Sequence, residues 1–426
     1  MSHSAPARVL WALSMGTLSP QARLVVIFAS LGHFLHHVLT GLFLTLAIVL
    51  ERVWEKPYAE VIALWTLGAA MIGLGAPLAG WLADRFGQAR MMTVFFLGLG
   101  ASCIWAGFVA DSSGMSMALA TLGVFGAIYH PVGMAWVSMT APAERRGRIM
   151  GVMGIAGSIG VALAAVIAGG LAELGGWRLA MILPGAVTIF AGILLMVTMS
   201  LGKIDFSAAA RGAKPGLEAA DASELRSPLA VLAVLTVTFT LGAIAYAAYT
   251  TALPKWVSDS LALDANEAGS LGLVVGAIML SGSVGQIIGG RLADRLPFKW
   301  LYVGTFILKL LPFAAAALFS GPSMLLVAIL IGLTFDMTAP IENLLLARYS
   351  SGRRRGLAFG LKFAIGFASA PLGINLVSIA YGQEFGGASF LFGILALLTA
   401  IMILAALLLP AERGRSSGRA ANAIAG

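Results

Sequence analysis

Residues 80–90 read Gly80-Trp81-Leu82-Ala83-Asp84-Arg85-Phe86-Gly87-Gln88-Ala89-Arg90, and they lie between two long apolar runs. A short turn between membrane helices has to reverse the chain, and small residues let the two helix ends approach closely. A similar phrase, Gly290-Arg291-Leu292-Ala293-Asp294-Arg295, follows 210 residues later. Two copies at about half the chain length predict two similar halves, each with this turn between two of its helices.

Composition places the chain in a lipid bilayer. Of its 426 residues 59% are hydrophobic and 11% are charged, and the mean hydropathy is +0.93. Soluble domains carry about a quarter charged residues, so the composition indicates an integral membrane protein. The net charge of +8 comes from bases in short segments between apolar runs, a pattern that sets topology and does not bind nucleic acid. The single cysteine, Cys103, excludes a disulfide within the chain and a cysteine metal cluster.

A spanning helix needs about 20 apolar residues, and this criterion predicts an all-α membrane protein with twelve transmembrane helices. The expected spans are 23–50, 58–82, 91–110, 115–140, 149–173, 177–201, 229–253, 266–292, 300–320, 322–349, 355–380 and 387–410. No cleavage-site pattern precedes the first run, so we expect it to be a retained helix.

The spans form two parallel six-helix halves, 23–201 and 229–410, joined by a polar linker at 202–228. A short N-terminal segment, 1–22, and a basic tail, 411–426, complete the chain. With both termini cytoplasmic, 21 of the 27 Lys and Arg lie on the cytoplasmic side. The positive-inside rule therefore predicts cytoplasmic termini and a cytoplasmic linker. We expect a multi-pass protein of the bacterial cytoplasmic membrane.

Both copies of the repeated phrase resemble the turn between the second and third helices in each half of a major facilitator superfamily transporter. The matching positions are Gly80, Asp84, Arg85, Gly87 and Arg90 in the first copy and Asp294 and Arg295 in the second. The resemblance covers about residues 23–410 and implies alternating access, with substrate bound between the halves near the membrane midplane. It implies that Asp84 gates the cytoplasmic side by meeting a helix N-terminus or a basic side chain. The alternative is a solvated turn whose bases only set topology.

A narrower resemblance lies in Gly126-Ala127-Ile128-Tyr129-His130-Pro131-Val132-Gly133, within the fourth expected helix. Together with Leu31-Gly32-His33-Phe34-Leu35 and Gly176-Trp177-Arg178, this run is similar to the fosmidomycin-resistance-type branch of the superfamily. The branch implies proton-driven drug export. An arginine in the fourth helix and a Gly-Pro pair in the fifth, common in the superfamily's drug exporters, are absent here. Export and uptake therefore both stay open.

Four histidines are expected inside the membrane. His33, His36, His37 and Thr40 follow the i, i+3, i+4, i+7 spacing of one helix face, about 15 Å from the cytoplasmic end. His130 lies at a comparable depth in the fourth helix. Intramembrane ionisable residues are usually functional or paired, so the cluster predicts proton coupling or anion recognition. Alternatively, the histidines hydrogen-bond neighbouring helices, or His33, His37 and His130 bind a metal with Asp336.

The tenth helix adds Asp336, Glu342 and Asn343, and depth arithmetic pairs Asp336 with Lys309 and Glu342 with Lys362. We expect Asp336 and Asn343 to face the cavity and the Glu342–Lys362 pair to be structural or part of a gate. The equivalent prolines, Pro131 and Pro340, are expected to bend their helices. The remaining candidates for the cavity are the hydroxyls of Tyr129, Tyr246 and Tyr249. Tyrosines placed like Tyr246 and Tyr249 are more often packing residues than cavity groups.

These features predict a secondary transporter of a small organic molecule, drug-like or weakly anionic, coupled to protons and acting as a monomer. The sequence has no G-x-x-x-x-G-K-[ST] phosphate loop, so ATP hydrolysis is not expected. An intramembrane enzyme is disfavoured, because the segment His33-Phe34-Leu35-His36-His37 lacks the acid of H-E-x-x-H. No cofactor is expected, and a transition-metal transporter is the alternative function.

Overall fold

The computed structural model describes residues 18–142, 145–204, 228–293, 295–319, 321–349, 355–382 and 385–410, and in these ranges the regular structure is helical. The predicted linker, the N-terminal segment and the basic tail lie almost wholly outside the described residues, as does Asp294. The helices of the first half are α2 (Pro20–Val53), α3 (Tyr58–Ala63), α4 (Trp65–Phe86), α5 (Gln88–Phe108), α6 (Ser112–Gly126), α7 (Tyr129–Thr140) and α8 (Arg146–Ser200). Those of the second half are α9 (Pro228–Leu261), α10 (Ala268–Ala293), α11 (Phe298–Ala316), α12 (Met324–Tyr349), α13 (Arg355–Ala380) and α14 (Ala388–Leu407).

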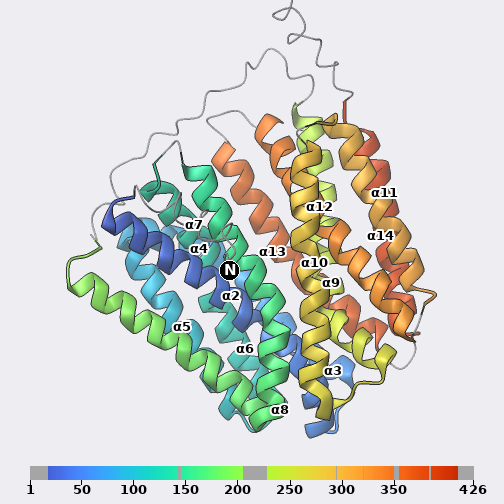
Figure 1. The fold of residues 1–426 in the computed structure, drawn as a ribbon, viewed down its shortest axis with the longest axis horizontal. Coiled ribbons are helices and arrows are strands. Elements are labelled where there is room, and N and C mark those ends of the chain that lie inside the picture. Colours follow the sequence, from blue (N-terminus) through green and yellow to red (C-terminus); the bar gives the residue numbers. More distant parts are fainter. Residues whose placement is uncertain are drawn as a thin grey trace, which may run out of the picture.

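Helix α8 contains two of the expected spans. Its 55 residues are interrupted at Gly175 and Gly176, whose backbone angles are not helical, and Gly176 has φ +79°. A residue with a side chain is strained at this φ, whereas glycine is not. Figure 1 shows the ribbon turning back at this point. By length and composition, ten helical segments of the described chain can cross a membrane, with α8 counted once, and Ala364–Ala380 of α13 is a further, shorter apolar segment. The count of twelve stays a prediction.

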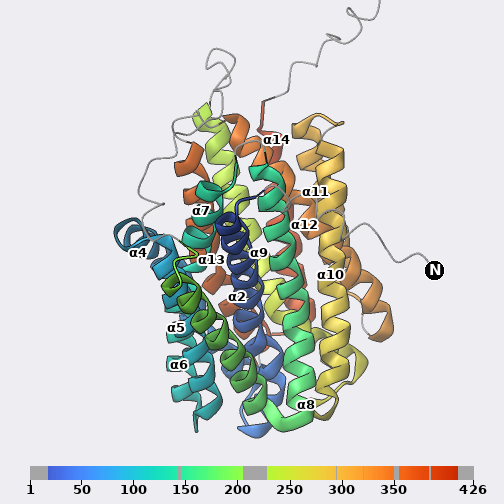
Figure 2. The ribbon, with the colours of Figure 1, turned by 60° about the vertical axis from the view of Figure 1, so that its left-hand side comes forward.

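The helices form two groups that lie side by side, α2–α8 and α9–α14 (Figures 1 and 2). The groups meet where α8 packs on α10 and where α4 packs on α13. Small residues allow these helix backbones to touch. A Cβ on Gly73 of α4 would lie 2.7 Å from the backbone nitrogen of Ala368 in α13. The site between the groups is therefore framed by four closely packed helices.

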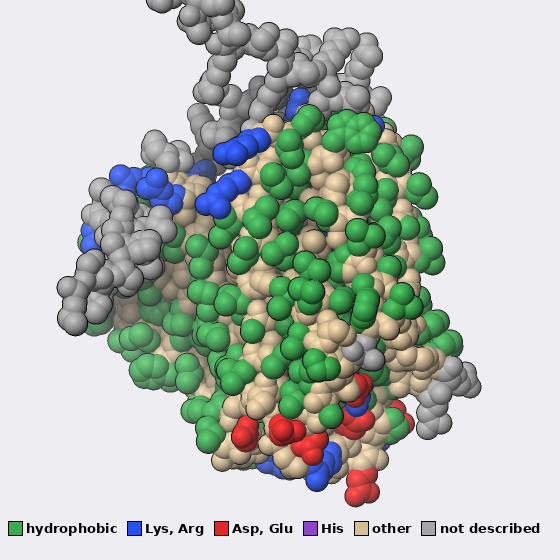
Figure 3. All heavy atoms as spheres, turned by 45° about the vertical axis from the view of Figure 1, so that its right-hand side comes forward, with side chains coloured by type: hydrophobic (Ala, Val, Ile, Leu, Met, Phe, Trp, Pro, Cys, Tyr) green, Lys and Arg blue, Asp and Glu red, His purple; other side chains and the backbone are tan. Residues whose placement is uncertain are grey.

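The outer surface matches a bilayer. On the face in Figure 3, a broad band of hydrophobic side chains separates one end with Lys and Arg from another end where Asp and Glu gather together with some Lys and Arg. Large apolar side chains are exposed on the surface of the molecule, such as Phe108 at 69% and Leu280 at 52%. A soluble monomer rarely exposes so much contiguous apolar surface. The chain is thus a multi-pass membrane protein.

The stretch at 80–90 contains less loop than the sequence suggests. Helix α4 continues to Phe86 and α5 begins at Gln88, so Gly87 alone separates them. Gly87 has φ +89°, and its N–H donates to the carbonyl of Ala83 at 2.8 Å. The turn can be this tight because glycine accepts the positive φ.

The two equivalent prolines differ in their effect. The chain leaves α6 at Gly126 and resumes helix at Tyr129, so Pro131 lies in the first turn of α7, where its missing N–H is tolerated. Pro340 lies inside α12, which runs from Met324 to Tyr349 without a break. Only the first-half helix is therefore divided near its proline.

Candidate functional site

A cavity of about 440 Å³ lies between the two groups of helices. Its lining mixes imidazoles, acids, lysines and aromatic rings from both groups, among them His36, His37, Thr40, Trp65, Tyr246, Lys309, Phe335, Asp336, Glu342 and Lys362. Pockets of this size accept small organic molecules.

A second cavity of about 250 Å³ adjoins the first. It is lined by His33 and Ser158 of the first group and by Tyr249 and Gln286 of the second. Both cavities share six lining residues: His37, Val161, Tyr246, Met279, Phe335 and Asp336. An imidazole from α2 and a carboxylate from α12 therefore face the same space from opposite groups.

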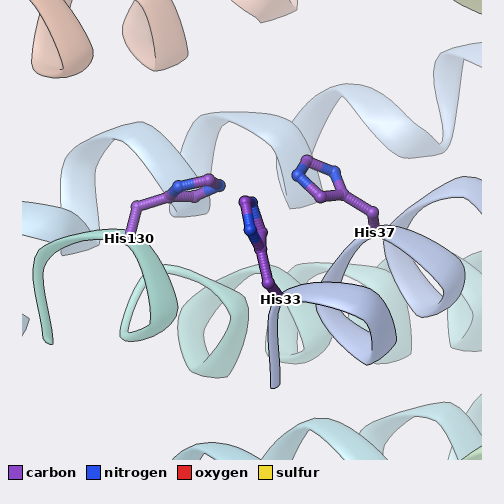
Figure 4. A group of neighbouring side chains, drawn as sticks. All are labelled: His33, His37 and His130. Atoms are coloured by element: carbon purple, nitrogen blue, oxygen red, sulfur yellow. The ribbon is translucent and has the colours of Figure 1, made fainter. Parts of the chain in front are cut away.

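The four membrane histidines meet in one cluster, made of His33, His36, His37 and His130. The ring centroid of His33 lies 5.0 Å from that of His37 and 5.5 Å from that of His130. The ring of His36 is 4.9 Å from that of His130. In Figure 4, His33 and His37 of α2 and His130 of α7 point toward one another. His33 and His37 line cavities, His36 is buried, and His130 also contacts the ring of Phe367 in the second group at 4.7 Å.

A backbone contact fixes the orientation of the His33 ring. Its Nδ1 lies 2.8 Å from the carbonyl oxygen of Met153 in α8. A carbonyl only accepts hydrogen bonds, so Nδ1 of His33 carries the hydrogen and donates it. In the neutral ring, Nε2 is then the acceptor and is free to take a proton or bind a cation.

The predicted tyrosines divide into two kinds. Tyr129 is fully buried and lines neither cavity, and its hydroxyl donates to the Ala29 carbonyl at 2.8 Å. The hydroxyl of Tyr249 donates in the same way to Ala328, at 3.0 Å. Tyr246 is 36% exposed and lines both cavities. The Tyr129 hydroxyl is therefore a link between helices and not the cavity group that the sequence suggests, because it is turned toward α2.

Lys309 and Asp336, which were predicted to pair, interact electrostatically, but the described residues show no direct ion pair between them. Within the described ranges Asp336 has no ion-pair partner, and Lys309 Nζ donates to Thr338 at 3.2 Å and lies 4.1 Å from the Phe335 ring centroid. Counting residues from the loop predicts similar depths in the membrane for the two charges, but it does not show on which face of its helix each charge lies. Residues two apart on a helix point about 200° apart, so Lys309 meets the face of Thr338 while Asp336 faces the cavities.

The second predicted pair does come together. Lys362 Nζ lies 3.2 Å from the Glu342 carboxylate and donates to the side chain of Asn343 at 2.8 Å. The hydroxyl of Tyr302 donates to the other oxygen of Glu342 at 3.1 Å. Asn343 therefore serves this network and lines neither cavity, whereas Glu342 and Lys362 line the larger one.

Polar contacts join the two groups at the end where α2 and α9 finish, and the sequence did not predict them. Lys255 of α9 lies 3.3 Å from Glu51 of α2 and 3.1 Å from Asp259. Three further contacts cross between the groups here: Tyr58 to the carbonyl of Thr251, Ser378 to that of Ala59, and the Gly269 N–H to Glu173. Acids close to the few bases at this end, such as Glu51 beside Arg52, were the available signal.

The repeated motif lies at the other end and is open. Asp84 and Arg85 are exposed, and Arg85 lies over the rings of Trp81 and Phe86. In the part of the chain that the structure describes, the Asp84 side chain has no ion-pair or hydrogen-bond partner. Among residues 18–142, 145–204 and the other described ranges, the contact expected of a gate at Asp84 is therefore not made.

Comparisons with known proteins agree with this architecture. An MFS-type efflux pump of Mycolicibacterium smegmatis is 29% identical over 326 residues, which cover 70% of this chain and 71% of that protein. The puromycin resistance protein pur8 of Streptomyces alboniger is 31% identical over 131 residues, 30% of this chain. The match spans about a quarter of the length of pur8 and of a multidrug resistance protein B homolog of Mycobacterium tuberculosis.

Solved structures share the fold. A bacterial homolog of the human lysosomal transporter Spinster, inward-facing and occupied, has a TM-score of 0.72 at 13% identity and covers 91% of this chain and 96% of its own. The nucleoside transporter NupG has a TM-score of 0.69 at 14% identity, and the match covers 90% of this chain and 99% of the NupG chain. The family model of the Major Facilitator Superfamily matches residues 26–271 and 239–423. This chain, a membrane transport protein, belongs to the Major Facilitator Superfamily.

Proposed function

We propose that the protein is a secondary active transporter that moves a small organic molecule by alternating access and couples this movement to protons. The observation that carries the proposal is the pair of adjoining cavities between the two halves, where His37 of α2 and Asp336 of α12 line the same space. Binding between halves that rock against each other is the general arrangement of such transporters.

Proton coupling rests on the ionisable groups of these cavities. The histidine cluster and Asp336 can each gain and lose a proton, and His33, His37 and Asp336 line the same cavity. Because they belong to different halves, rocking changes the distance between them. A proton and a cargo that compete for the same groups would then be moved in exchange.

The cargo class follows from the lining and from the relatives. Aromatic and aliphatic side chains surround a few polar groups, a lining that suits drug-like or weakly anionic molecules. The relatives include proteins named for puromycin resistance, multidrug resistance and efflux, and a probable nitrate/nitrite antiporter of Thermus thermophilus. With the resemblance to the fosmidomycin-resistance-type branch, these names favour export. None of them refers to a metal, and metal is not proposed as the cargo.

Topology completes the proposal. Twelve spans with cytoplasmic termini in a bacterial cytoplasmic membrane put the basic end of Figure 3 inside. The end held by Lys255 and Glu51 is then the outer one. The protein is proposed to work as a monomer, because both faces of the site come from one chain.

The test is flux into proteoliposomes under an imposed pH gradient, with puromycin, uridine and nitrate as cargo probes. We expect flux of at least one probe, and loss of its gradient dependence in Asp336→Asn and His37→Gln. Asp111→Asn is the matched control, because Asp111 caps α6 at a distance from the cavities and asparagine caps a helix equally well. Flux through both cavity variants that still follows the gradient would contradict the assignment.

A further inference from the structure

Three histidines are close enough to share one ion. The ligand atoms of His33, His37 and His130 all lie within 4.8 Å of one another. Figure 4 shows the rings converging from α2 and α7. In a tetrahedral site with metal–nitrogen bonds of about 2.0–2.1 Å, ligand nitrogens lie roughly 3.4 Å apart. The ligand atoms would have to approach by at most about 1.4 Å to reach that spacing.

The hydrogen bond of His33 is the kind that supports a metal ligand. Ligating histidines almost always donate their second ring N–H to a carbonyl or a carboxylate, which fixes the tautomer and the ring orientation. His33 Nδ1 donates to the carbonyl of Met153 at 2.8 Å, and this presents Nε2 to the cluster. Gly157, one turn further along α8, packs against the face of the same ring. The ring is held in place although it borders a cavity.

A fourth histidine beside these three also has a buried ring nitrogen, which supports an ion in the cluster. His36 is 2% exposed, and its Nδ1 has no hydrogen-bond partner among the described residues. Its ring lies 5.0 Å from that of His37 and 4.9 Å from that of His130. Buried polar atoms are rarely left without a partner, and an ion or water that is not drawn is one usual explanation.

We propose that His33, His37 and His130 bind a divalent first-row transition metal ion, with Zn²⁺ and Co²⁺ as the fitting examples. Neutral imidazole suits these ions, and no thiolate is required. Three protein ligands leave a fourth position, as in zinc sites that bind water or substrate. Two of the three ligands, His33 and His37, line the cavity that Asp336 also lines. The inference concerns binding of the ion and goes beyond the proposed transport, because it can be measured without any flux.

The probe is Co²⁺ added to the purified full-length protein in detergent. We expect a visible absorption spectrum of nitrogen-bound, low-coordinate cobalt at one ion per chain, and its displacement by Zn²⁺. The variants His33→Gln, His37→Gln and His130→Gln should each lower Co²⁺ affinity by more than about tenfold. His3→Gln is the matched control, because His3 is the one histidine of the sequence outside the cluster of four. It should bind cobalt as the unchanged protein does.

Gly157→Ala gives a test that keeps all the histidines. A Cβ at this position overlaps the His33 ring, so affinity should fall, whereas Gly154→Ala, whose Cβ meets no atom within 4 Å, should bind normally. Absence of cobalt binding in the unchanged protein, or equal affinity in the three histidine variants and the unchanged protein, would overturn the inference. A failure of flux with intact cobalt binding would count against the proposed transport alone.

Discussion

At the residue scale, the position of His33 depends on two neighbours in α8. Met153 accepts the hydrogen bond of its Nδ1, and Gly157 leaves room for its ring. Both neighbours belong to one helix, so a change in α8 reaches the histidine cluster without replacing a histidine. The geometry of the ring is thus testable separately from its chemistry.

Gly157→Ala is expected to reduce gradient-driven transport by roughly tenfold or more, because a displaced ring no longer presents Nε2 to its neighbours. The measurement is initial flux in proteoliposomes at equal protein content. Gly151→Ala lies in the same helix, lines neither cavity and should transport normally, since its methyl group meets no atom within 4 Å. Equal loss in both variants would show that helix α8 tolerates no alanine, and not that His33 has moved.

Tyr129→Phe separates a structural hydroxyl from a functional one. Its hydroxyl bonds the Ala29 carbonyl in a fully buried place, so its removal should cost about 1–3 kcal/mol of stability. Thermal unfolding followed in detergent should show a lower midpoint, while transport stays near the original rate. Lost transport at unchanged stability would instead indicate that the Tyr129 hydroxyl takes part in transport.

At the scale of elements, the charged pairs show which kind of contact a sequence can predict. Glu342 and Lys362 were paired from equal distances to one loop, and their atoms lie 3.2 Å apart. The same arithmetic paired Lys309 with Asp336, but Lys309 meets Thr338 instead. Depth follows from counting residues, whereas the face that a helix turns to its neighbour depends on packing that no count provides.

The positions of the helices could also be predicted by counting residues along the chain. Each expected span coincides with helix to within several residues, because length and apolar content decide which segments cross a bilayer. The clustering of His33 and His37 followed from their spacing on one face. The contacts of Lys255 with Glu51 and of Tyr58 with Thr251 could not be predicted, because they join separate halves in one particular conformation.

The Glu342–Lys362 pair should behave as a buried pair between α12 and α13. Their side chains are 15% and 16% exposed, so Lys362→Met leaves a carboxylate poorly solvated and should cost several kcal/mol, of the order of 3–5. The double change Glu342→Gln with Lys362→Met should recover much of that loss. Thermal unfolding of the single and double variants measures the coupling, and additive effects would contradict a direct interaction.

At the scale of the whole molecule, the polar contacts between the halves gather at one end. Lys255 links α9 to the carboxylate of Glu51 in α2, and Ser378 of α13 bonds the carbonyl of Ala59. At the other end Asp84 is exposed. Under the proposed alternating access, the contacts at the Lys255 end would stabilise one of the two conformations.

Lys255→Met should shift the population toward the conformation that is open at this end. Partly exposed ion pairs contribute about 1 kcal/mol, a change of roughly fivefold in the ratio of the two states. Distances between spin labels placed on the two halves near this end measure the shift. Lys56→Met is the matched control, because Lys56 pairs with Glu60 within one half and should leave the distances unchanged.

Exchange of protons for cargo by the groups between the halves should change the pH inside liposomes that contain the protein. Liposomes containing the protein and a pH-sensitive dye would receive the cargo probe that shows flux, without an imposed gradient. The account predicts that cargo movement shifts the internal pH, and that Asp336→Asn abolishes this shift while Asp111→Asn does not. Cargo that crosses with no change of internal pH in the unchanged protein would contradict it.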